Sequence, residues 1–233
     1  MNAQQLISAL HSLANPKAKE ALSYFKIESK HALGIRTPEL RKLAKQIGKN
    51  HELALELWQS EIFEARMLAA LIAEPKKVTE RLMEKWLKDF DNWGIVDCTC
   101  GELFDKTPFA YKKAIEWSTR KKEFEKRAAF SMMAILAVHD KKASDEKFLP
   151  FFPIIKREAN DERNFVKKAV NWALRQIGKR NVKLNKLAIK TAKEIHQLDS
   201  STAKWIASDA LRELQSEAMK PHQVRQGQQT KSP

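Results

Sequence analysis

The apolar residues of the chain recur every three or four positions, and alternating apolar and polar runs are scarce. This spacing places apolar side chains on one face of an α-helix and argues against β-sheets. Three of these apolar stretches follow a capping residue and a proline suited to the first helical turn. The pairs are Asn15-Pro16, Thr37-Pro38 and Thr107-Pro108. Gly48 is expected to end the helix that follows Thr37. The pattern predicts an all-α protein with about a dozen helices joined by short polar loops.

Two longer helices are predicted in the second half of the chain. One opens at Asn160 or Asp161 and closes at Gly178, and the other opens at Ser200 or Ser201. The periodicity fades after this last helix. We therefore expect one helical-repeat domain over residues 1–217 and a disordered polar tail over residues 218–233.

Several predicted helices are similar to one another. The run FEAR at 63–66 is echoed by FEKR at 124–127. Comparable points follow at steps of 31, 30, 41 and 37 residues, namely Arg66, Asp97, Arg127, Lys168 and Trp205. Paired helices at this spacing predict an α-α superhelix of HEAT-like repeats, and an irregular helical bundle is the alternative. A superhelix of this kind curves, and a basic concave face would suit a DNA duplex.

Composition narrows the class of protein. The chain has 233 residues, 43% of them hydrophobic and 31% charged, as in ordinary globular proteins. Six glycines exclude collagen and two cysteines exclude a disulfide scaffold. Charges interrupt every apolar run well before the ~18 residues of a membrane span. The N-terminus lacks a basic leader followed by an apolar block, so we expect a cytoplasmic protein with reduced thiols.

The charge balance is the first indication of function. Lys and Arg total 43 against 29 Asp and Glu, which gives a net charge of +14. Such an excess favours a polyanionic partner, most often nucleic acid. The alternative is a basic protein whose surface is merely solvated.

Trp93 and Asp97 are the residues whose spacing suggests chemistry. They lie four apart, and Asp91 or Asn92 can cap their helix, so both side chains project from one face near its start. An aspartate beside an aromatic plane is useful if that face lines a groove. The residues alone leave open that Trp93 belongs to the core and Asp97 is a surface charge stabilised by the helix dipole.

Arg127 and Trp172 lie in otherwise apolar helices. Packing alone accounts for each of them, and an ion pair between repeats is a common role for such an arginine. The residues do not decide between these roles and a functional one.

Four segments occur in an order and at spacings that resemble the AlkD-like family of alkylpurine DNA glycosylases. They are LGIRTPELR at 33–41, NWGIVD at 92–97, KRAAF at 126–130 and KKAVNWALR at 167–175. The resemblance runs from about Tyr24 to Trp205. It implies HEAT-like repeats and an enzyme that hydrolyses the N-glycosidic bond of cationic alkylated purines, such as 3-methyladenine and 7-methylguanine, in double-stranded DNA. The family is thought to act on the exposed sugar without a deep base pocket.

The resemblance also implies site residues. Asp97 matches the catalytic carboxylate, and Trp93 and Trp172 match an aromatic cleft around the deoxyribose of the lesion. Arg127 matches a contact to the DNA backbone, and Tyr24 matches an N-terminal tyrosine. All but Tyr24 are expected to converge on one concave face of a right-handed superhelix.

Elementary chemistry is consistent with these roles. A cationic purine is already a good leaving group, so one carboxylate can suffice where sugar hydrolases use two. As the bond breaks, the sugar becomes oxocarbenium-like, and an ionised Asp97 can stabilise this charge and orient water. The faces of Trp93 and Trp172 can each add roughly 0.5–2 kcal/mol. Gly94 departs from the family, in which a larger or polar residue is expected after the tryptophan. A glycine can loosen a helix start and so change the direction in which Trp93 points.

Further basic residues complete the expected DNA surface, namely Lys167, Lys168 and Arg175, with Lys179 and Arg180 beside them. The chain has no phosphate-binding glycine motif, so we expect no nucleotide cofactor. We also expect a monomer that has no membrane partner. Cys98 and Cys100 lack a matching ligand pair, so we expect free buried thiols and no metal. Two other functions stay open: a non-catalytic HEAT-like protein that binds altered DNA, and a protein–protein scaffold.

Overall fold

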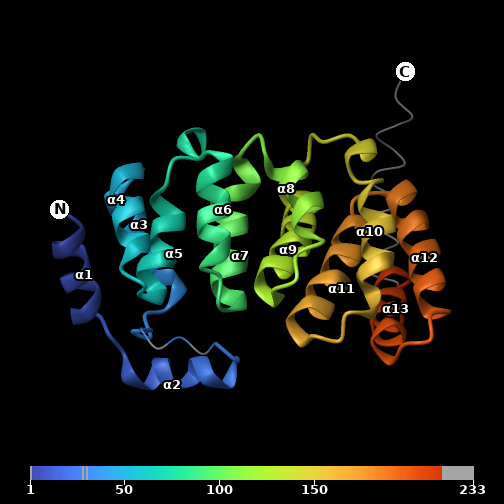
Figure 1. Ribbon diagram of the computed structural model, residues 1–233, viewed down its shortest axis with the longest axis horizontal. Coiled ribbons are helices and arrows are strands. Elements are labelled where there is room, and N and C mark those ends of the chain that lie inside the picture. Colours follow the sequence, from blue (N-terminus) through green and yellow to red (C-terminus); the bar gives the residue numbers. More distant parts are fainter. Residues whose placement is uncertain (1, 28, 30, 217–233) are drawn as a thin grey trace. The chain divides into compact units, whose positions relative to one another are not determined.

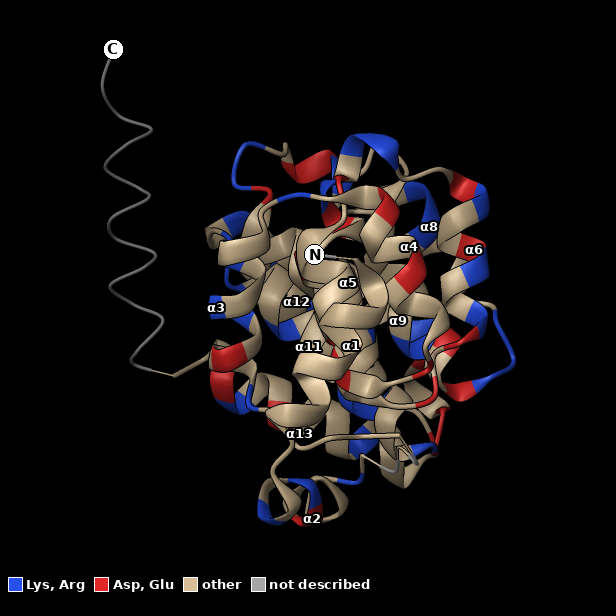
Figure 2. Cartoon of the chain, turned by 90° about the vertical axis from the view of Figure 1, so that its left-hand side faces the viewer, with Lys and Arg blue, Asp and Glu red and all other residues tan. Residues whose placement is uncertain are grey.

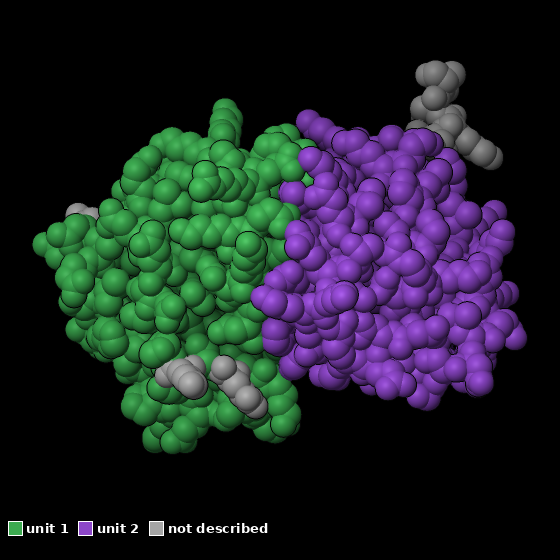
Figure 3. All heavy atoms as spheres, in the orientation of Figure 1, with its two compact units in different colours: residues 1–109 green, residues 110–233 purple. Residues whose placement is uncertain are grey.

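The structure of the protein is a computed structural model that describes residues 2–27, 29 and 31–216 (Figure 1). These residues form thirteen α-helices, four short 3-10 helices and no strand, which confirms the all-α prediction. Among them, no helix has the length and apolar character needed to cross a membrane. The chain divides into two compact units, residues 1–109 and residues 110–233, which Figure 3 colours separately. We describe each unit by itself.

Unit 1 (residues 1–109) contains seven α-helices and two 3-10 helices among its described residues. They are α1 (Ala3–Ser12), α2 (Pro16–Tyr24), α3 (Thr37–Ile47), α4 (His51–Gln59), α5 (Phe63–Ile72), η1 (Pro75–Lys77), α6 (Glu80–Lys88), α7 (Trp93–Glu102) and η2 (Phe104–Lys106). Helix α5 packs against α3, α4 and α7. Behind them, the buried rings of Trp58 and Trp86 stack with centroids 3.9 Å apart, and Trp58 Nε1 donates to Asp89. This core makes a rigid base for α7.

Unit 2 (residues 110–233) contains six α-helices and two 3-10 helices among its described residues. They are α8 (Ala110–Trp117), α9 (Glu123–His139), η3 (Asp145–Lys147), α10 (Phe151–Arg157), η4 (Glu158–Asn160), α11 (Asn164–Gly178), α12 (Val182–His196) and α13 (Ser201–Leu214). Helix α11 packs between α9 and α13, while α12 packs on α10, α11 and α13. The Tyr111 ring of α8 stacks on the ring of Phe151 of α10.

The predicted repeat spacing agrees with the helices. Helices α5, α7, α9, α11 and α13 begin 30, 30, 41 and 37 residues apart. The comparable points identified in the sequence all fall on the fourth or fifth residue of these helices. Another helix precedes each of them, namely α4, α6, α8, α10 or α12. The spacing between comparable points in the sequence therefore corresponds to the length of one pair of helices with its loops.

Some predicted helix ends are confirmed. Asn15 caps α2 through a bond from Ala18 N, and Ser200 caps α13 through a bond from Ala203 N. Gly48 ends α3 with a positive φ of 74°, a conformation that glycine adopts without strain. Pro38 stands in the first turn of α3 as expected, but Thr37 is already helical and Arg36 is the residue before it.

Two predicted helix starts are wrong. Helix α11 begins at Asn164, because the Asp161 carboxylate accepts from the backbone and guanidinium of Arg163 instead of capping a helix. Helix α8 begins at Ala110, because the Thr107 hydroxyl donates back to the Phe104 carbonyl and closes the preceding turn. In both cases a side chain that could cap a helix makes hydrogen bonds within a local turn instead.

Gly178 is the last residue of α11, and its role is close packing. A Cβ atom at this position would lie 2.7 Å from Leu214 Cδ2 and 2.8 Å from Ala188 Cβ. Glycine therefore lets α11, α12 and α13 approach one another. The predicted tail, residues 218–233, lies outside the described residues, and the single domain over 1–217 stays a prediction.

Candidate functional site

Trp93 is the first residue of α7 and is held at two points. Asn92, 1% exposed, caps the helix through its Oδ1 atom, which accepts from Ile95 N at 3.0 Å. The indole Nε1 of Trp93 donates to the carbonyl of Phe25, just after α2, at 2.8 Å. The indole is therefore fixed in orientation, as a binding or catalytic aromatic side chain requires.

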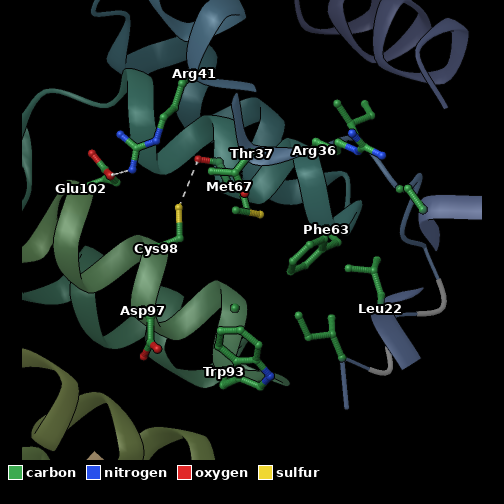
Figure 4. A pocket seen from close by; sticks show the side chains of 15 residues that line it. Leu22, Arg36, Thr37, Arg41, Phe63, Met67, Trp93, Asp97, Cys98 and Glu102 are labelled. Carbon is green, nitrogen blue, oxygen red and sulfur yellow. Dashed lines mark hydrogen bonds and ion pairs between the residues drawn. The ribbon is translucent and has the colours of Figure 1, made fainter. Parts of the chain in front are cut away.

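Asp97 follows one turn later on α7, and with Trp93 it lines a cavity of about 550 Å³ (Figure 4). The volume is in the range of small-molecule sites. The wall is mainly apolar and the polar side chains gather toward α3 and α7. The other lining residues are Ala18, Leu22, Ile27, Gly34, Ile35, Arg36, Thr37, Arg41, Phe63, Met67, Gly94, Cys98 and Glu102. The Trp93–Asp97 pair thus faces a hollow.

Gly94 does not loosen the start of α7. A Cβ atom there would lie 3.1 Å from Asn92 Oδ1 and 3.2 Å from both Ile27 Cδ1 and Phe63 Cζ. Such contacts are tighter than those of most real Cβ atoms. A Cβ atom at position 94 would require these neighbouring side chains to shift by a few tenths of an ångström, so glycine suits the packing at the start of α7.

Buried Glu64 holds the loop that forms one wall of the cavity. This side chain is 0% exposed and accepts from the backbone N–H groups of Leu33, Gly34 and Ile35 at 2.6 to 3.2 Å. Gly34 has φ of 79°, and a Cβ atom there would lie 2.3 Å from Asn15 O. The loop, α5 and the start of α2 are therefore tied together.

An ion pair lies at the far end of α7 from Trp93, and the Cys98 thiol lies between that end and Asp97 (Figure 4). Arg41 Nη2 meets Glu102 Oε1 at 2.5 Å. Burial, and next the Glu102 charge, raise the pKa of Cys98 to about 12. Its thiol lies 3.9 Å from the Met67 carbonyl. The thiol stays protonated near neutral pH, so Cys98 is a poor nucleophile.

Tyr24 is the last residue of α2 and is 83% exposed. Its ring meets that of Phe25 edge to face, with centroids 5.4 Å apart. Since the Phe25 carbonyl accepts from Trp93, unit 1 brings Tyr24, Trp93 and Asp97 into one region. An exposed tyrosine at a helix end is suited to stacking on a base or sugar.

Arg127 lies in unit 2 and is only 6% exposed. Its Nη1 donates to the carbonyl of Phe165 near the start of α11, at 2.8 Å. The observed role of Arg127 is therefore to tie α9 to α11, and its predicted contact to the DNA backbone stays a prediction.

The remaining predicted residues lie on α11. Trp172 is half-buried and Lys168 is exposed. Lys167 Nζ lies 5.3 Å from the ring centroid of Trp205 on α13, a cation–π distance. Arg175 pairs with Glu213 and lies 3.7 Å from Asp209, so acidic partners on α13 hold its guanidinium.

Trp93 and Asp97 belong to unit 1, whereas Arg127 and Trp172 belong to unit 2. Their convergence on one concave face stays a prediction. In the described part of the chain, no three His, Cys, Asp or Glu side chains gather as metal ligands. Neither cysteine forms a disulfide; Cys100 is buried as expected, whereas Cys98 is only half-buried.

The net charge is unequally divided. Unit 1 has 16 Lys and Arg against 15 Asp and Glu, a net charge of +1. Basic and acidic segments alternate along its helix α6 (Figure 2). Unit 2 has 27 against 14, a net charge of +13. Attraction to a polyanion therefore resides almost entirely in unit 2.

Sequence reasoning missed the cavity and several polar residues that line it. Arg36, Thr37 and Arg41 belong to a segment that was noted for its resemblance and not for its chemistry. Glu102 is the last residue of α7, five positions after Asp97. For Arg36, Thr37 and Arg41 the only signal in the sequence is that they belong to the segment 33–41. For Glu102 it is the short distance along the chain from Asp97.

Comparison with known proteins places the chain in a family. Residues 6–214 match the family described as DNA alkylation repair enzyme, so the chain belongs to that family. An uncharacterized protein of Listeria innocua, Lin0241, is 30% identical over 117 residues. That match covers 48% of this chain, and the chain spans about half, 52%, of that relative.

A solved structure shares the fold. It is described as representing a new family of proteins related to the HEAT-like repeat DNA glycosylases, with affinity for branched DNA structures. The TM-score is 0.75 at 21% identity, over 91% of this chain and 95% of that one. The likeness confirms the predicted HEAT-like repeat fold.

Proposed function

We propose that the protein is a DNA glycosylase that removes cationic alkylated purines, such as 3-methyladenine and 7-methylguanine, from double-stranded DNA. We place this activity in the cytoplasm and assign it to a monomer. Membership in the DNA alkylation repair family supports a repair role. The single observation that carries the proposal is the fixed Trp93–Asp97 pair at the edge of the cavity in unit 1.

The pair fits the chemistry of a cationic lesion. The alkylated purine leaves without a strong general acid, so the protein must mainly stabilise positive charge on the sugar. A carboxylate and an aromatic face do this when they are held in place before the reaction. The Asn92 cap and the bond to Phe25 supply that rigidity.

The DNA itself would be held through unit 2. Its net charge of +13 would attract phosphates without reading bases. Lys168 is exposed on α11, and Lys167 is half-buried beside Trp205. In this proposal unit 1 carries the chemistry and unit 2 most of the affinity.

The test is release of free base from randomly methylated DNA. Wild type should release 3-methyladenine or 7-methylguanine, and Asp97→Asn should cut release by about 10²-fold, the scale of one lost transition-state contact. Glu56→Gln makes the same charge change on the exposed side of α4 and should match wild type. Equal release by Asp97→Asn and wild type would remove Asp97 from the mechanism.

The second candidate is a non-catalytic protein that binds altered or branched DNA. The structural relative with affinity for branched DNA structures and the charge of unit 2 favour it. No base release by wild type from any methylated DNA, with tight binding to duplex or branched DNA, would select this candidate.

A further inference from the structure

Helix α12 carries a row of lysines on its exposed face. Lys183, Lys186, Lys190 and Lys193 are all exposed and are three or four residues apart. At 100° per residue they fall within an arc of about 80°. With a rise of 1.5 Å per residue, the row is about 15 Å long.

This row faces away from the rest of unit 2. The buried residues of α12 lie on the opposite side of the helix, namely Leu184, Asn185, Ala188, Thr191, Ala192 and Ile195. Through them α12 packs on α10, α11 and α13. The row is therefore separate from the α11 surface that carries Lys168 and Trp172.

Three of the four lysines are not neutralised by acidic partners. Lys183 lies within 3.5 to 3.8 Å of Asp145 and Glu146. Among the described residues, Lys186, Lys190 and Lys193 make no ion pair or hydrogen bond. Three positive charges of the row therefore have no ion-pair partner, and the carboxylate nearest to them is Glu194, one turn after Lys190.

The acidic residue of α12 does not cancel this charge. Glu194 has Lys156 of α10 as its partner, at 2.7 Å. That ion pair, and to a smaller degree the charge of Lys190, lowers the pKa of Glu194. The carboxylate is thus already matched by a cation outside the row.

The surface beside the row is hollowed. A hollow of about 530 Å³ is lined by three lysines of the row together with Ile189, Gln197 and the carboxylate Glu194, which is paired with Lys156. A second, of about 360 Å³, lies between α10 and α12 and also reaches Lys190. The lysines therefore border concave surface on which a rounded, charged ridge can rest.

Helix α6 of unit 1 also carries exposed basic residues at helical spacing, Arg81, Lys85 and Lys88, but it has three of them and not four. Helices α4 and α8 carry no such row. Helix α4 of unit 1 carries Glu52 and Glu56 on its exposed positions and no Lys or Arg. Helix α8 of unit 2 has two lysines, Lys112 and Lys113, and both pair with Glu116. The row on α12 is the longer of these two, and it borders a hollow of the surface.

We propose that the α12 lysine row binds the phosphate backbone of a second duplex segment, so that the protein holds two segments of DNA at once. The proposal rests on the proposed function in that the α11 side of unit 2 holds the first segment. A duplex carries one charge per about 1.7 Å when both strands are counted, so 15 Å of it carries about nine phosphates, and those on the facing side can meet the row. Lysines bind these as point charges, without reading sequence.

Two DNA-binding surfaces on one protein change the affinity for a DNA that can reach both of them. Once one segment is bound, an arm joined to it meets the second surface at high effective concentration. A four-way junction should therefore bind more tightly than a linear duplex of equal length. Linear duplex, which engages one surface at a time, should depend little on the row.

The experiment compares junction and linear duplex for wild type and a Lys186→Gln, Lys190→Gln, Lys193→Gln variant, with the full chain. Gln has the same helix propensity as Lys, so α12 should persist, which circular dichroism checks. A Lys76→Gln, Lys85→Gln, Lys88→Gln variant of unit 1 makes the same charge change on exposed residues. Phosphatidylserine vesicles serve as a second anionic surface.

The expected result is a loss of about tenfold in junction affinity for the α12 variant, with at most about a threefold loss for linear duplex. The salt dependence of junction binding should fall by about 2 to 3 in log–log slope. The unit 1 variant should keep the wild-type ratio of junction to duplex affinity.

An unchanged ratio in the α12 variant would overturn the second surface and leave duplex binding intact. Vesicle binding that the variant loses, with an unchanged DNA ratio, would overturn it in favour of a membrane. Wild type that binds no duplex at all would instead overturn the proposed function.

Discussion

The two units differ in both packing and charge. Unit 1 has a net charge of +1 and includes α2, a helix without a single buried residue that borders the cavity. Unit 2 has a net charge of +13, and 12 of the 17 residues of its helix α9 are buried. A loosely packed helix beside a cavity suits a site that admits a substrate, whereas a rigid basic body suits attraction of DNA. Chemistry and affinity are therefore separable by mutation.

The largest expected effect concerns the cavity wall of unit 1. Glu64→Ala leaves three backbone N–H groups without their acceptor, at about 1–3 kcal/mol each. We expect a loss of about 3 kcal/mol or more, confined to unit 1. Hydrogen exchange of Leu33, Gly34 and Ile35 measures it, with unit 2 as the internal reference.

Glu64→Gln is the matched control, because it keeps one acceptor oxygen. It should restore part of the lost protection. Protection that is the same in Glu64→Ala as in wild type would show that the loop is held by other contacts.

The next effect concerns the charge of unit 2. Neutralising Lys167 and Lys168 with Gln should lower the log–log salt slope of duplex binding by about 2, roughly one per phosphate contact. Lys76→Gln with Lys85→Gln in unit 1 should change it by less than about 0.5. Fluorescence anisotropy between 50 and 200 mM salt makes the measurement. Equal slopes for the two variants would contradict the assignment of affinity to unit 2.

A smaller effect is expected for the anchoring of Trp93. Trp93→Phe keeps an aromatic face but loses the bond from Nε1 to the Phe25 carbonyl, worth about 0.5–1.5 kcal/mol. We expect base release to fall by about 3- to 10-fold, because the ring is no longer fixed. Single-turnover rates test this. A rate equal to that of wild type would mean that the bond has no part in positioning.

The smallest effect concerns Cys98 at high pH. Its pKa is raised from 9.0 to about 12 in the folded state, first by burial and next by Glu102. Folding therefore favours the protonated thiol, and this stabilisation is complete below pH 9 and lost as the pH rises toward 12. Cys98→Ala should show a shallower loss of stability over this range in urea unfolding. Identical pH profiles for the variant and wild type would contradict the raised pKa.

The fold could be predicted from the sequence because helix periodicity and repeat spacing are local signals. Asn15, Gly48 and Ser200 were located as helix ends for the same reason. Asp161 misled the prediction because its carboxylate binds the nearby Arg163, a competition that no spacing rule decides.

The candidate site was only partly predictable. A spacing of four placed Trp93 and Asp97 on one face of α7, and the cavity beside them confirms that this face is hollowed. The burial of Arg127 and the ion pairs of Arg175 depend on α11 and α13, which lie about 40 residues away in sequence. The close packing around Gly94 depends likewise on Ile27 and Phe63.

The central claim is that Asp97 of unit 1 supplies catalysis while unit 2 supplies affinity. The most direct measurement is the single-turnover rate of base release against enzyme concentration, for Asp97→Asn and for Lys167→Gln with Lys168→Gln. Asp97→Asn should lower the saturating rate by about 10²-fold without changing the half-saturating concentration, and the lysine variant should do the reverse. An unchanged saturating rate for Asp97→Asn would contradict the account.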